Sequence, residues 1–168
     1  TSQPEARRSR HSRRARGAES KQQPTQFAGA DVVVVDDERV IVKMVMRQLA
    51  RLGVGLTHSL DDGIHLMDHL ESRATLPSAI LLDITMPQSD GVSVCKLLRS
   101  DRRFANLPVY AMTANVEGKA AYELAGFTGL LGKPFSKKSL SQVLQHSQQV
   151  VAARNAALAT GVESTLHF

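Results

Sequence analysis

The sequence predicts an α/β domain in which a doubly wound, five-stranded parallel sheet carries helices on both faces. Two observations predict this fold class. Short runs of Val, Ile and Leu alternate along the chain with longer segments whose apolar residues have the helical period. The runs are apolar throughout, which is typical of strands buried on both faces. Strands that alternate with helices imply a parallel sheet, because each helix returns the chain to the same edge.

The first two strands flank a well-defined helix. Four successive valines predict a strand at residues 32–35. A helix is expected over residues 38–52, with Gly53 placed to end it. Its apolar positions have helical spacing: Ile41, Val45, Leu49 and Leu52. A second, weaker strand is expected at residues 54–58.

The second helix and the third strand lead to an isolated carboxylate. Asp61 and Asp62 are of a residue type that favours helix N-termini, so a helix is expected over residues 61–73. Residues 79–82 form an apolar run that stops at Asp83. The third strand is therefore predicted to bring Asp83 to the carboxyl edge of the sheet.

The next elements continue the alternation. A helix is expected at residues 92–100 and a strand at residues 107–112. A short helix over residues 117–125 is predicted to end at Gly126, and residues 127–131 are predicted to form the fifth strand.

The last helix completes the predicted domain. Ser136 is expected to cap it, and it is predicted to reach about residue 153. The chain then divides into three parts. Residues 1–28 are expected to form a disordered basic tail or linker, residues 29–152 the folded domain and residues 153–168 a C-terminal tail.

The N-terminal tail accounts for the whole net charge of +5. Residues 1–26 hold seven basic and two acidic side chains, whereas the rest of the chain holds 14 of each. The globular part is therefore neutral, and the high isoelectric point does not indicate a nucleic-acid face on the fold. Three interpretations of the tail stay open: a solvated linker from an upstream domain, an arm for nuclear import or nucleic-acid binding, and a transit peptide.

Cysteine content and hydropathy exclude two classes of protein. A single cysteine, Cys95, excludes an internal disulfide and fits a reducing compartment. No apolar run approaches the length of a membrane span, so no membrane contact is expected from this segment. A cytoplasmic location is predicted, with a nuclear one as the alternative through the arginine-rich tail. The chain begins with Thr1, which fits a piece of a longer protein or a processed product.

Charged and hydroxyl side chains follow four of the predicted strands. In chain order they are Asp36 and Asp37, Asp83, Thr113 and Lys133. Because ligands bind beyond the carboxyl ends of parallel strands, we expect these side chains to meet in one crevice. Two carboxylates about 4 Å apart repel by roughly 4 kcal/mol at an effective dielectric near 20. Three carboxylates in one crevice therefore predict a bound cation.

Mg²⁺ is the expected cofactor. It prefers oxygen ligands, and it uses one or two protein carboxylates together with waters and a phosphate oxygen. Lys133 adds a positive charge, and Thr113 adds a hydrogen-bond donor for the same anion. A carboxylate nucleophile beside these groups is suited to phosphoryl transfer, in which the protein positions the reactants and neutralises charge.

With these residues in place, the chain resembles the response-regulator receiver family of two-component signalling. Four segments carry the resemblance, in the family's order and spacing: VVVVDDE at 32–38, ILLDITMPQSDG at 80–91, VYAMTAN at 109–115 and GFTGLLGKPF at 126–135. The resemblance covers about residues 31–148 and implies a flavodoxin-like fold with strand order 2-1-3-4-5. It implies a phosphoacceptor in a His-Asp phosphorelay and no enzyme, with only slow autophosphatase activity. It fits a stand-alone receiver or the receiver of a larger protein, such as a hybrid sensor kinase.

The resemblance also implies a role for each residue of the crevice. Asp83 is similar to the family's phosphorylated aspartate. Asp36, Asp37 and Asp83 resemble the metal-binding carboxylates, and the main-chain carbonyl of Thr85 is a further implied ligand.

Two more roles come from the resemblance. Thr113 resembles the residue whose hydroxyl turns toward the phosphoryl group, and Lys133 resembles the lysine that pairs with it. The bond between Lys133 and Pro134 is expected to be cis, as in the family. The family often has Tyr or Phe three residues before this lysine, where the sequence has Leu130. We expect phosphorylation to survive this departure and the coupling through this position to be weaker.

The implied partners are proteins. A sensor histidine kinase or a histidine phosphotransfer protein is expected as the donor. A downstream protein is expected to bind the face made by the fourth helix, the fifth strand and the fifth helix. Nucleic acid is expected only through the basic N-terminal tail.

Two other functions and one other site are kept as alternatives. A phosphatase of the haloacid dehalogenase type also uses an aspartate after a strand, but it requires a second aspartate where Thr85 stands. A receiver-like module that is never phosphorylated is disfavoured by the complete acidic set. His65 and His69 are spaced to bind zinc on a helix, but the local sequence offers no third His or Cys, so we expect them on an exposed helix face.

Overall fold

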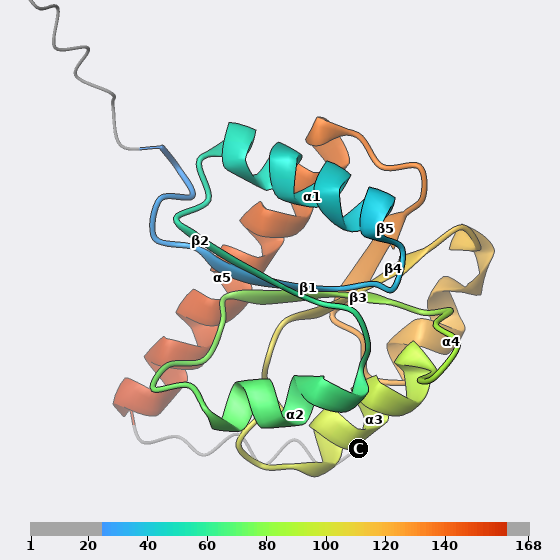
Figure 1. The fold of residues 1–168 in the computed structure, drawn as a ribbon. Helices are drawn as coiled ribbons and strands as arrows, with labels where there is room; N and C mark the ends of the chain where they lie inside the picture. The colour runs from blue at the N-terminus through green and yellow to red at the C-terminus, as the bar shows by residue number, and fades with distance from the viewer. Residues whose placement is uncertain (1–24, 161–168) are drawn as a thin grey trace, which may run out of the picture.

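A five-stranded parallel sheet forms the centre of the molecule (Figure 1). The computed structural model describes residues 25–160 of the 168-residue chain. The strands are β1 (Asp31–Val35), β2 (Leu56–Leu60), β3 (Ala79–Asp83), β4 (Val109–Thr113) and β5 (Gly129–Gly132). Their order is β2-β1-β3-β4-β5, and every neighbouring pair is parallel. The predicted fold class and strand order are confirmed.

Helices cover both faces of this sheet. They are α1 (Arg39–Leu52), α2 (Ile64–Glu71), α3 (Gly91–Ser100), α4 (Lys119–Leu124) and α5 (Lys137–Thr160), with a 3₁₀ turn, η1 (Val116–Gly118), before α4. Figure 1 shows α1 above the edge-on sheet and α2 and α3 below it. The core cluster on one face takes its helical side chains from α1 and α5, and the cluster on the other face takes them from α2 and α3.

The four valines of β1 illustrate why continuous apolar runs predict this architecture. Val32 and Val34 pack into the cluster of α1 and α5, whereas Val33 and Val35 pack into the cluster of α2 and α3. All four are fully buried. A strand that is covered on both faces has no side that tolerates polar residues, so the run is apolar at every position.

Two helices differ from their predicted bounds by more than two residues at one end. The prediction that α2 begins at residue 61 is wrong, since it begins at Ile64. The Asp62 carboxylate instead accepts the main-chain N–H groups of Ile64 and His65 at 2.9 and 3.0 Å, so Asp62 caps the helix from outside. The prediction that α5 ends near residue 153 is also wrong, because the helix continues to Thr160 through an alanine-rich segment of high helix propensity.

The packed part of the chain begins earlier than residue 29. Phe27 is 2% exposed and belongs to the core cluster of α1 and α5. Residues 1–24 of the predicted tail lie outside the described residues, as do residues 161–168. Within residues 25–160, no helix has the combination of length and apolar character that crossing a bilayer requires.

A polar cluster at the edge of the sheet includes His69. The expectation of an exposed face is wrong for this residue, which is partly buried. Its Nε2 lies 3.2 Å from an Arg73 guanidinium nitrogen, and its ring centroid lies 5.2 Å from that of His58 on β2. Arg73 in turn forms an ion pair with Asp31 at the start of β1. The cluster therefore connects the end of α2 to the edge of the sheet.

Acidification is expected to weaken this connection. Burial lowers the pKa of His69 below its ordinary value of 6.5, and Arg73 and His58 lower it further. The unfolded chain then binds more protons than the folded chain as the pH falls through 6.5, so stability is lost on that side. Urea denaturation on both sides of this pH measures the loss, and His69→Gln should reduce it. Equal pH dependence in the variant and the wild type would contradict the prediction.

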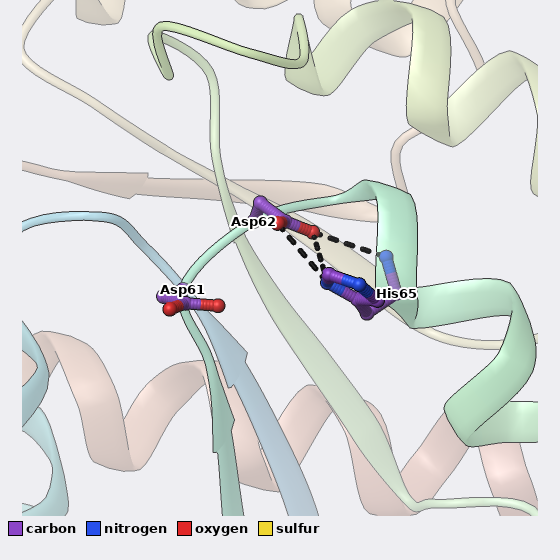
Figure 2. A group of neighbouring side chains, drawn as sticks. All are labelled: Asp61, Asp62 and His65. Carbon is purple, nitrogen blue, oxygen red and sulfur yellow. Dashed lines mark hydrogen bonds and ion pairs between the residues drawn. The ribbon is translucent and has the colours of Figure 1, made fainter.

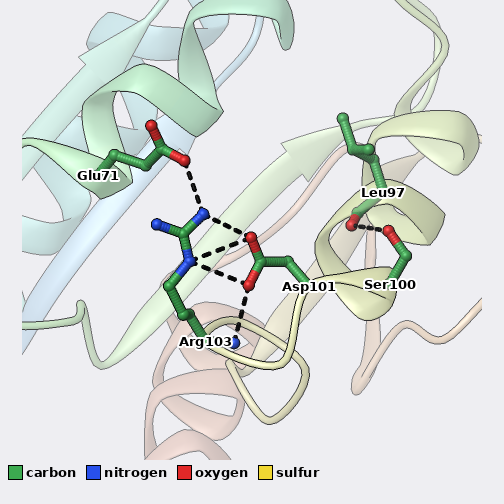
Figure 3. Close-up of polar contacts among 5 residues, drawn as sticks. All are labelled: Glu71, Leu97, Ser100, Asp101 and Arg103. Carbon is green, nitrogen blue, oxygen red and sulfur yellow. Dashed lines mark hydrogen bonds and ion pairs between the residues drawn. The ribbon is translucent and has the colours of Figure 1, made fainter.

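A second polar network joins α2 to the loop after α3 (Figure 3). The Arg103 guanidinium contacts the carboxylates of Glu71 and Asp101 at 2.7 and 2.6 Å. Beside it, the Ser100 hydroxyl donates to the main-chain carbonyl of Leu97 and closes the last turn of α3. The Arg103 side chain is 58% exposed, so salt screens these ion pairs and the fold depends little on them.

Candidate functional site

Three carboxylates meet at the carboxyl edge of the sheet. Asp36 and Asp37 directly follow β1, and Asp83 is the last residue of β3, which is the neighbour of β1. One carboxylate oxygen from each lies within 4.8 Å of the other two. Asp36 and Asp83 are buried, whereas Asp37 is exposed. The sheet topology thus brings together side chains that are almost 50 residues apart in the sequence.

Lys133 places an ammonium group among these carboxylates. Its Nζ donates to Asp83 Oδ1 at 2.7 Å and to Asp36 Oδ2 at 2.9 Å. The residue follows β5, where its main-chain N–H donates to the carbonyl of Thr113 at 2.7 Å. The bond between Lys133 and Pro134 is cis, as predicted. The gathering of Asp36, Asp37, Asp83 and Lys133 in one place is confirmed.

The charges of this group do not cancel. Three carboxylates face one ammonium group, which leaves two negative charges uncompensated. Burial raises the pKa of Asp83, and the nearby Asp36 raises it further, while the contacts with Lys133 oppose the rise. Burial alone would lower the pKa of Lys133, but its hydrogen bonds with Asp83 and Asp36 outweigh burial and raise it. The site is electrostatically suited to a divalent cation.

The loop after β3 holds the Asp83 carboxylate in position. The main-chain N–H of Thr85 donates to Asp83 Oδ2 at 3.1 Å, and Thr85 forms an isolated bridge with Asp90. Asp90 then caps α3 by accepting the N–H groups of Val92 and Ser93. The loop is therefore fixed at both ends, by the strand and by the helix.

Gly91 allows this loop to fold back on Asp83. Its N–H donates to the carbonyl of Ile84 at 3.1 Å. A Cβ at this position would lie 2.2 Å from the Asp83 carbonyl oxygen and 3.0 Å from the Asp83 carbonyl carbon. Both are main-chain atoms that cannot turn away, so the close approach requires a residue without a side chain.

Thr113 ends β4 and is 7% exposed. Its hydroxyl oxygen accepts the main-chain N–H of Asn115 at 3.0 Å and lies 3.3 Å from the hydroxyl of Tyr122 on α4. The sequence interpretation missed Tyr122. The available signal was the one aromatic residue in this short helix. Leu130 lies on β5 opposite Ala111 of β4 and packs partly buried against the core.

A second group of possible metal ligands lies beside the first. Figure 2 shows Asp61, Asp62 and His65 at the start of α2, with Asp62 pointing toward His65. The Asp62 carboxylate contacts the His65 ring nitrogen at 3.0 Å in addition to capping the helix. Hydrogen bonding from the main chain of His65 lowers the pKa of Asp62. The contacts between Asp62 and His65 are therefore explained by capping of α2.

An open depression of about 310 Å³ lies between the two acidic groups. Its lining includes Asp37 from the first group, Asp61 and Asp62 from the second, and Met86 and Pro87 from the loop after β3. Because Asp37 belongs to both the depression and the carboxylate group, a ligand can approach the carboxylates from this side.

Comparisons with known proteins agree on one family. The family model for the response regulator receiver domain matches residues 32–145. The chain is 36% identical to response regulator MprA of Mycobacterium avium over 113 residues, which are 65% of this chain and 46% of that protein. It is 28% identical to transcription factor SKN7 of Chaetomium thermophilum over 137 residues, which are 80% of this chain and 18% of that protein. The chain thus spans less than half the length of these relatives.

A solved structure adds information about the same edge of the fold. The receiver domain of sensor histidine kinase PA1611 from Pseudomonas aeruginosa matches with a TM-score of 0.62 at 29% identity, covering 69% of this chain and 94% of that one. That structure holds a magnesium ion coordinated in its active-site cleft. Since the family model covers well over half of the sequence, the chain belongs to the response regulator receiver domains of two-component signalling.

Proposed function

We propose that this receiver accepts a phosphoryl group on Asp83 and thereby switches a protein-interaction face. The observation that carries the proposal is the position of Asp83, whose carboxylate contacts Lys133 and lies within 4.8 Å of two more carboxylates. A lone buried aspartate would favour its neutral form, but this one is held beside a cation in a site that a second cation can complete.

The carboxylate group fits Mg²⁺. Two uncompensated negative charges and oxygen-only side chains are what this ion requires. Asp36, Asp37, Asp83 and the main-chain carbonyl of Thr85 would hold it, and when bound it would neutralise charge on the transferred phosphoryl oxygens. The magnesium in the related PA1611 receiver domain supports the same choice of metal.

The transfer requires little of the protein beyond position and charge. An Asp83 carboxylate oxygen attacks phosphorus in line with the nitrogen of a donor phosphohistidine. The O–P bond forms as the P–N bond breaks, and the electron pair leaves with the imidazole nitrogen, which solvent protonates. Lys133 stays within reach of the phosphoryl oxygens, because its Nζ already contacts Asp83. The Thr113 hydroxyl donates a hydrogen bond to the same oxygens.

The donor and the output belong to other proteins or other domains. A sensor histidine kinase or a histidine phosphotransfer protein is the proposed donor. The proposed output surface is the face made by α4, β5 and α5, where Leu124 of α4 is exposed, together with the exposed Val116 in η1 just before α4. Slow hydrolysis of the acyl phosphate resets the switch. Because Phe27 belongs to the core and α5 continues to Thr160, we place the receiver at residues 27–160. We also place it in the cytoplasm, and we leave any nucleic-acid contact to the basic tail.

Acetyl phosphate tests the assignment of Asp83. With Mg²⁺ present, the wild-type chain is expected to gain one hydroxylamine-labile phosphoryl group, measured by intact mass. Asp83→Asn should abolish the gain, because an amide oxygen is a poor nucleophile. Asp68→Asn, at an exposed aspartate on α2, is the matched control and should be labelled as the wild type is. Full labelling of Asp83→Asn would contradict the assignment.

A general phosphatase is not supported by this site. Thr85 stands where a haloacid-dehalogenase-type enzyme requires its general acid, and the matched family consists of signalling receivers. Turnover of a generic phosphate ester, measured in the same samples, separates the two functions. Multiple turnovers that Asp83→Asn abolishes would favour the enzyme.

A further inference from the structure

The hydroxyl of Thr113 has a limited capacity for hydrogen bonds. It offers one proton and two lone pairs. The N–H of Asn115 uses one lone pair at 3.0 Å, and the Tyr122 hydroxyl lies 3.3 Å away. Either hydroxyl can be the donor in this contact; when Thr113 is the donor, its single proton can serve Tyr122 or an oxygen bound to Asp83, but not both.

Tyr122 is also the residue that attaches α4 to the core. The other five residues of this helix are exposed, whereas Tyr122 is partly buried and packs against the core cluster of α2 and α3. Its ring meets that of Phe127 edge-on, with centroids 6.1 Å apart. It also covers Gly118, where a Cβ would lie 3.1 Å from the ring. A change at the Tyr122 hydroxyl thus acts on the main attachment of α4.

Leu130 cannot take part in the same hydrogen bonding. It lies on β5 beside Ala111 of β4, and its side chain has no polar atom. Among residues 25–160, Tyr122 is the side chain that lies within hydrogen-bonding distance of the Thr113 hydroxyl. A polar link from Thr113 to the surface therefore leads through α4.

We propose that Tyr122 couples the phosphorylation of Asp83 to the position of α4. In the unphosphorylated protein the Thr113 hydroxyl donates a hydrogen bond to the Tyr122 hydroxyl. When Asp83 carries the phosphoryl group, Thr113 turns its proton toward the phosphoryl oxygen, and the contact with Tyr122 breaks. The helix then loses one of its few attachments and moves. This inference rests on the proposed function, because it requires a phosphoryl group at Asp83.

The movement changes an apolar surface. Leu124 at the end of α4 is 90% exposed, and Val116 in η1 is 52% exposed. A partner that binds these side chains in only one position of α4 distinguishes the two states. Linkage requires the reverse effect as well, so such a partner would change the affinity of the site for a phosphoryl mimic by the same factor.

The tyrosine content of the chain allows a direct test. The chain has two tyrosines and no tryptophan, so either Tyr→Phe variant is a single-tyrosine protein. Tyr110→Phe leaves Tyr122 as the reporter. Tyr122→Phe leaves Tyr110, whose hydroxyl lies 3.0 Å from His146 Nδ1 on α5, and serves as the matched control. The full chain is titrated with Mg²⁺ and beryllium fluoride, a phosphoryl mimic, and tyrosine fluorescence is measured.

The coupling predicts a specific pattern. The fluorescence of Tyr110→Phe should change on saturation, and that of Tyr122→Phe should stay constant. Adding Thr113→Val to Tyr110→Phe should remove the change, because the hydroxyl is lost while the shape is kept. Amide hydrogen exchange of residues 119–125 should rise on titration in the wild type and stay constant in Tyr122→Phe. A residue with only a packing role would not produce this dependence on the Thr113 hydroxyl.

Two outcomes would overturn the coupling, and they are distinguishable. Labelling of the wild type by acetyl phosphate is measured in parallel. If Asp83 is labelled while the Tyr122 signal and the exchange of α4 stay unchanged, the coupling is wrong and the proposed function stands. If no label and no effect of beryllium fluoride are found, both are wrong. A response that persists in the Thr113→Val background would also contradict the coupling.

Discussion

Lys133→Met is expected to destabilise the metal-free protein by about 3–5 kcal/mol, the usual effect of removing one partner from a buried ion pair. The Lys133 side chain is 17% exposed, and its partners Asp36 and Asp83 are 0% and 6% exposed. Methionine keeps the length of the side chain but leaves three neighbouring carboxylates without a cation. Urea denaturation in the presence of a chelator measures the loss.

Magnesium should restore part of this stability. A ligand that binds only the folded state adds about 2.7 kcal/mol at a hundred times its dissociation constant. The restoration should be larger in Lys133→Met than in the wild type, because the variant has more uncompensated negative charge. Labelling by acetyl phosphate should nevertheless stay low, since no ammonium group remains beside the phosphoryl oxygens. The matched control is Lys138→Met, at an exposed lysine of α5. Equal stability of the two variants in chelator would contradict the prediction.

The carboxylate group could be predicted from the sequence because topology alone determines it. Asp36 and Asp83 each follow an apolar run, and adjacent parallel strands must end at the same edge. No side-chain detail is needed for that step. The same reasoning placed Lys133 correctly, since β5 ends beside β4 at this edge.

The features that the sequence did not reveal depend on contacts between elements. The contact between Thr113 and Tyr122 depends on how the chain runs from β4 through η1 to α4. No periodicity in the sequence predicts that course. His69 lies one helical turn after His65. His69 is partly covered because its ring lies beside His58 on the edge strand β2, whereas His65 is exposed. The length of α5 was underestimated because its last turns carry few buried side chains that would show a helical pattern.

The Asp83 carboxylate opposes folding in the absence of a ligand. Burial and the proximity of Asp36 raise the pKa of Asp83, which means that its ionised form is disfavoured in the folded protein. Such strain is common where groups are held for chemistry. The loop after β3 must therefore be fixed by other contacts, and the close approach at Gly91 is one of them.

Gly91→Ala is expected to have the second large effect, although it changes no charged or polar group. The added Cβ would lie 2.2 Å from the Asp83 carbonyl oxygen, so either α3 or the end of β3 must shift. Forced overpacking of this kind costs about 1–3 kcal/mol and occasionally more, and here the obstacle is main chain, so the upper end is expected. A shift of β3 would move Asp83 away from Lys133, so labelling by acetyl phosphate should also fall sharply.

Gly29→Ala separates this effect from a general cost of replacing glycine. Among residues 25–160, no atom beyond Gly29 and its two chain neighbours lies within 4 Å of a Cβ built at Gly29, so the added methyl group meets open space. This control should keep the denaturation midpoint and the labelling of the wild type. If Gly91→Ala also kept the denaturation midpoint and the labelling of the wild type, the loop would be able to move without displacing Asp83. The fixed geometry of the acceptor loop would then not be what holds the carboxylate beside Lys133.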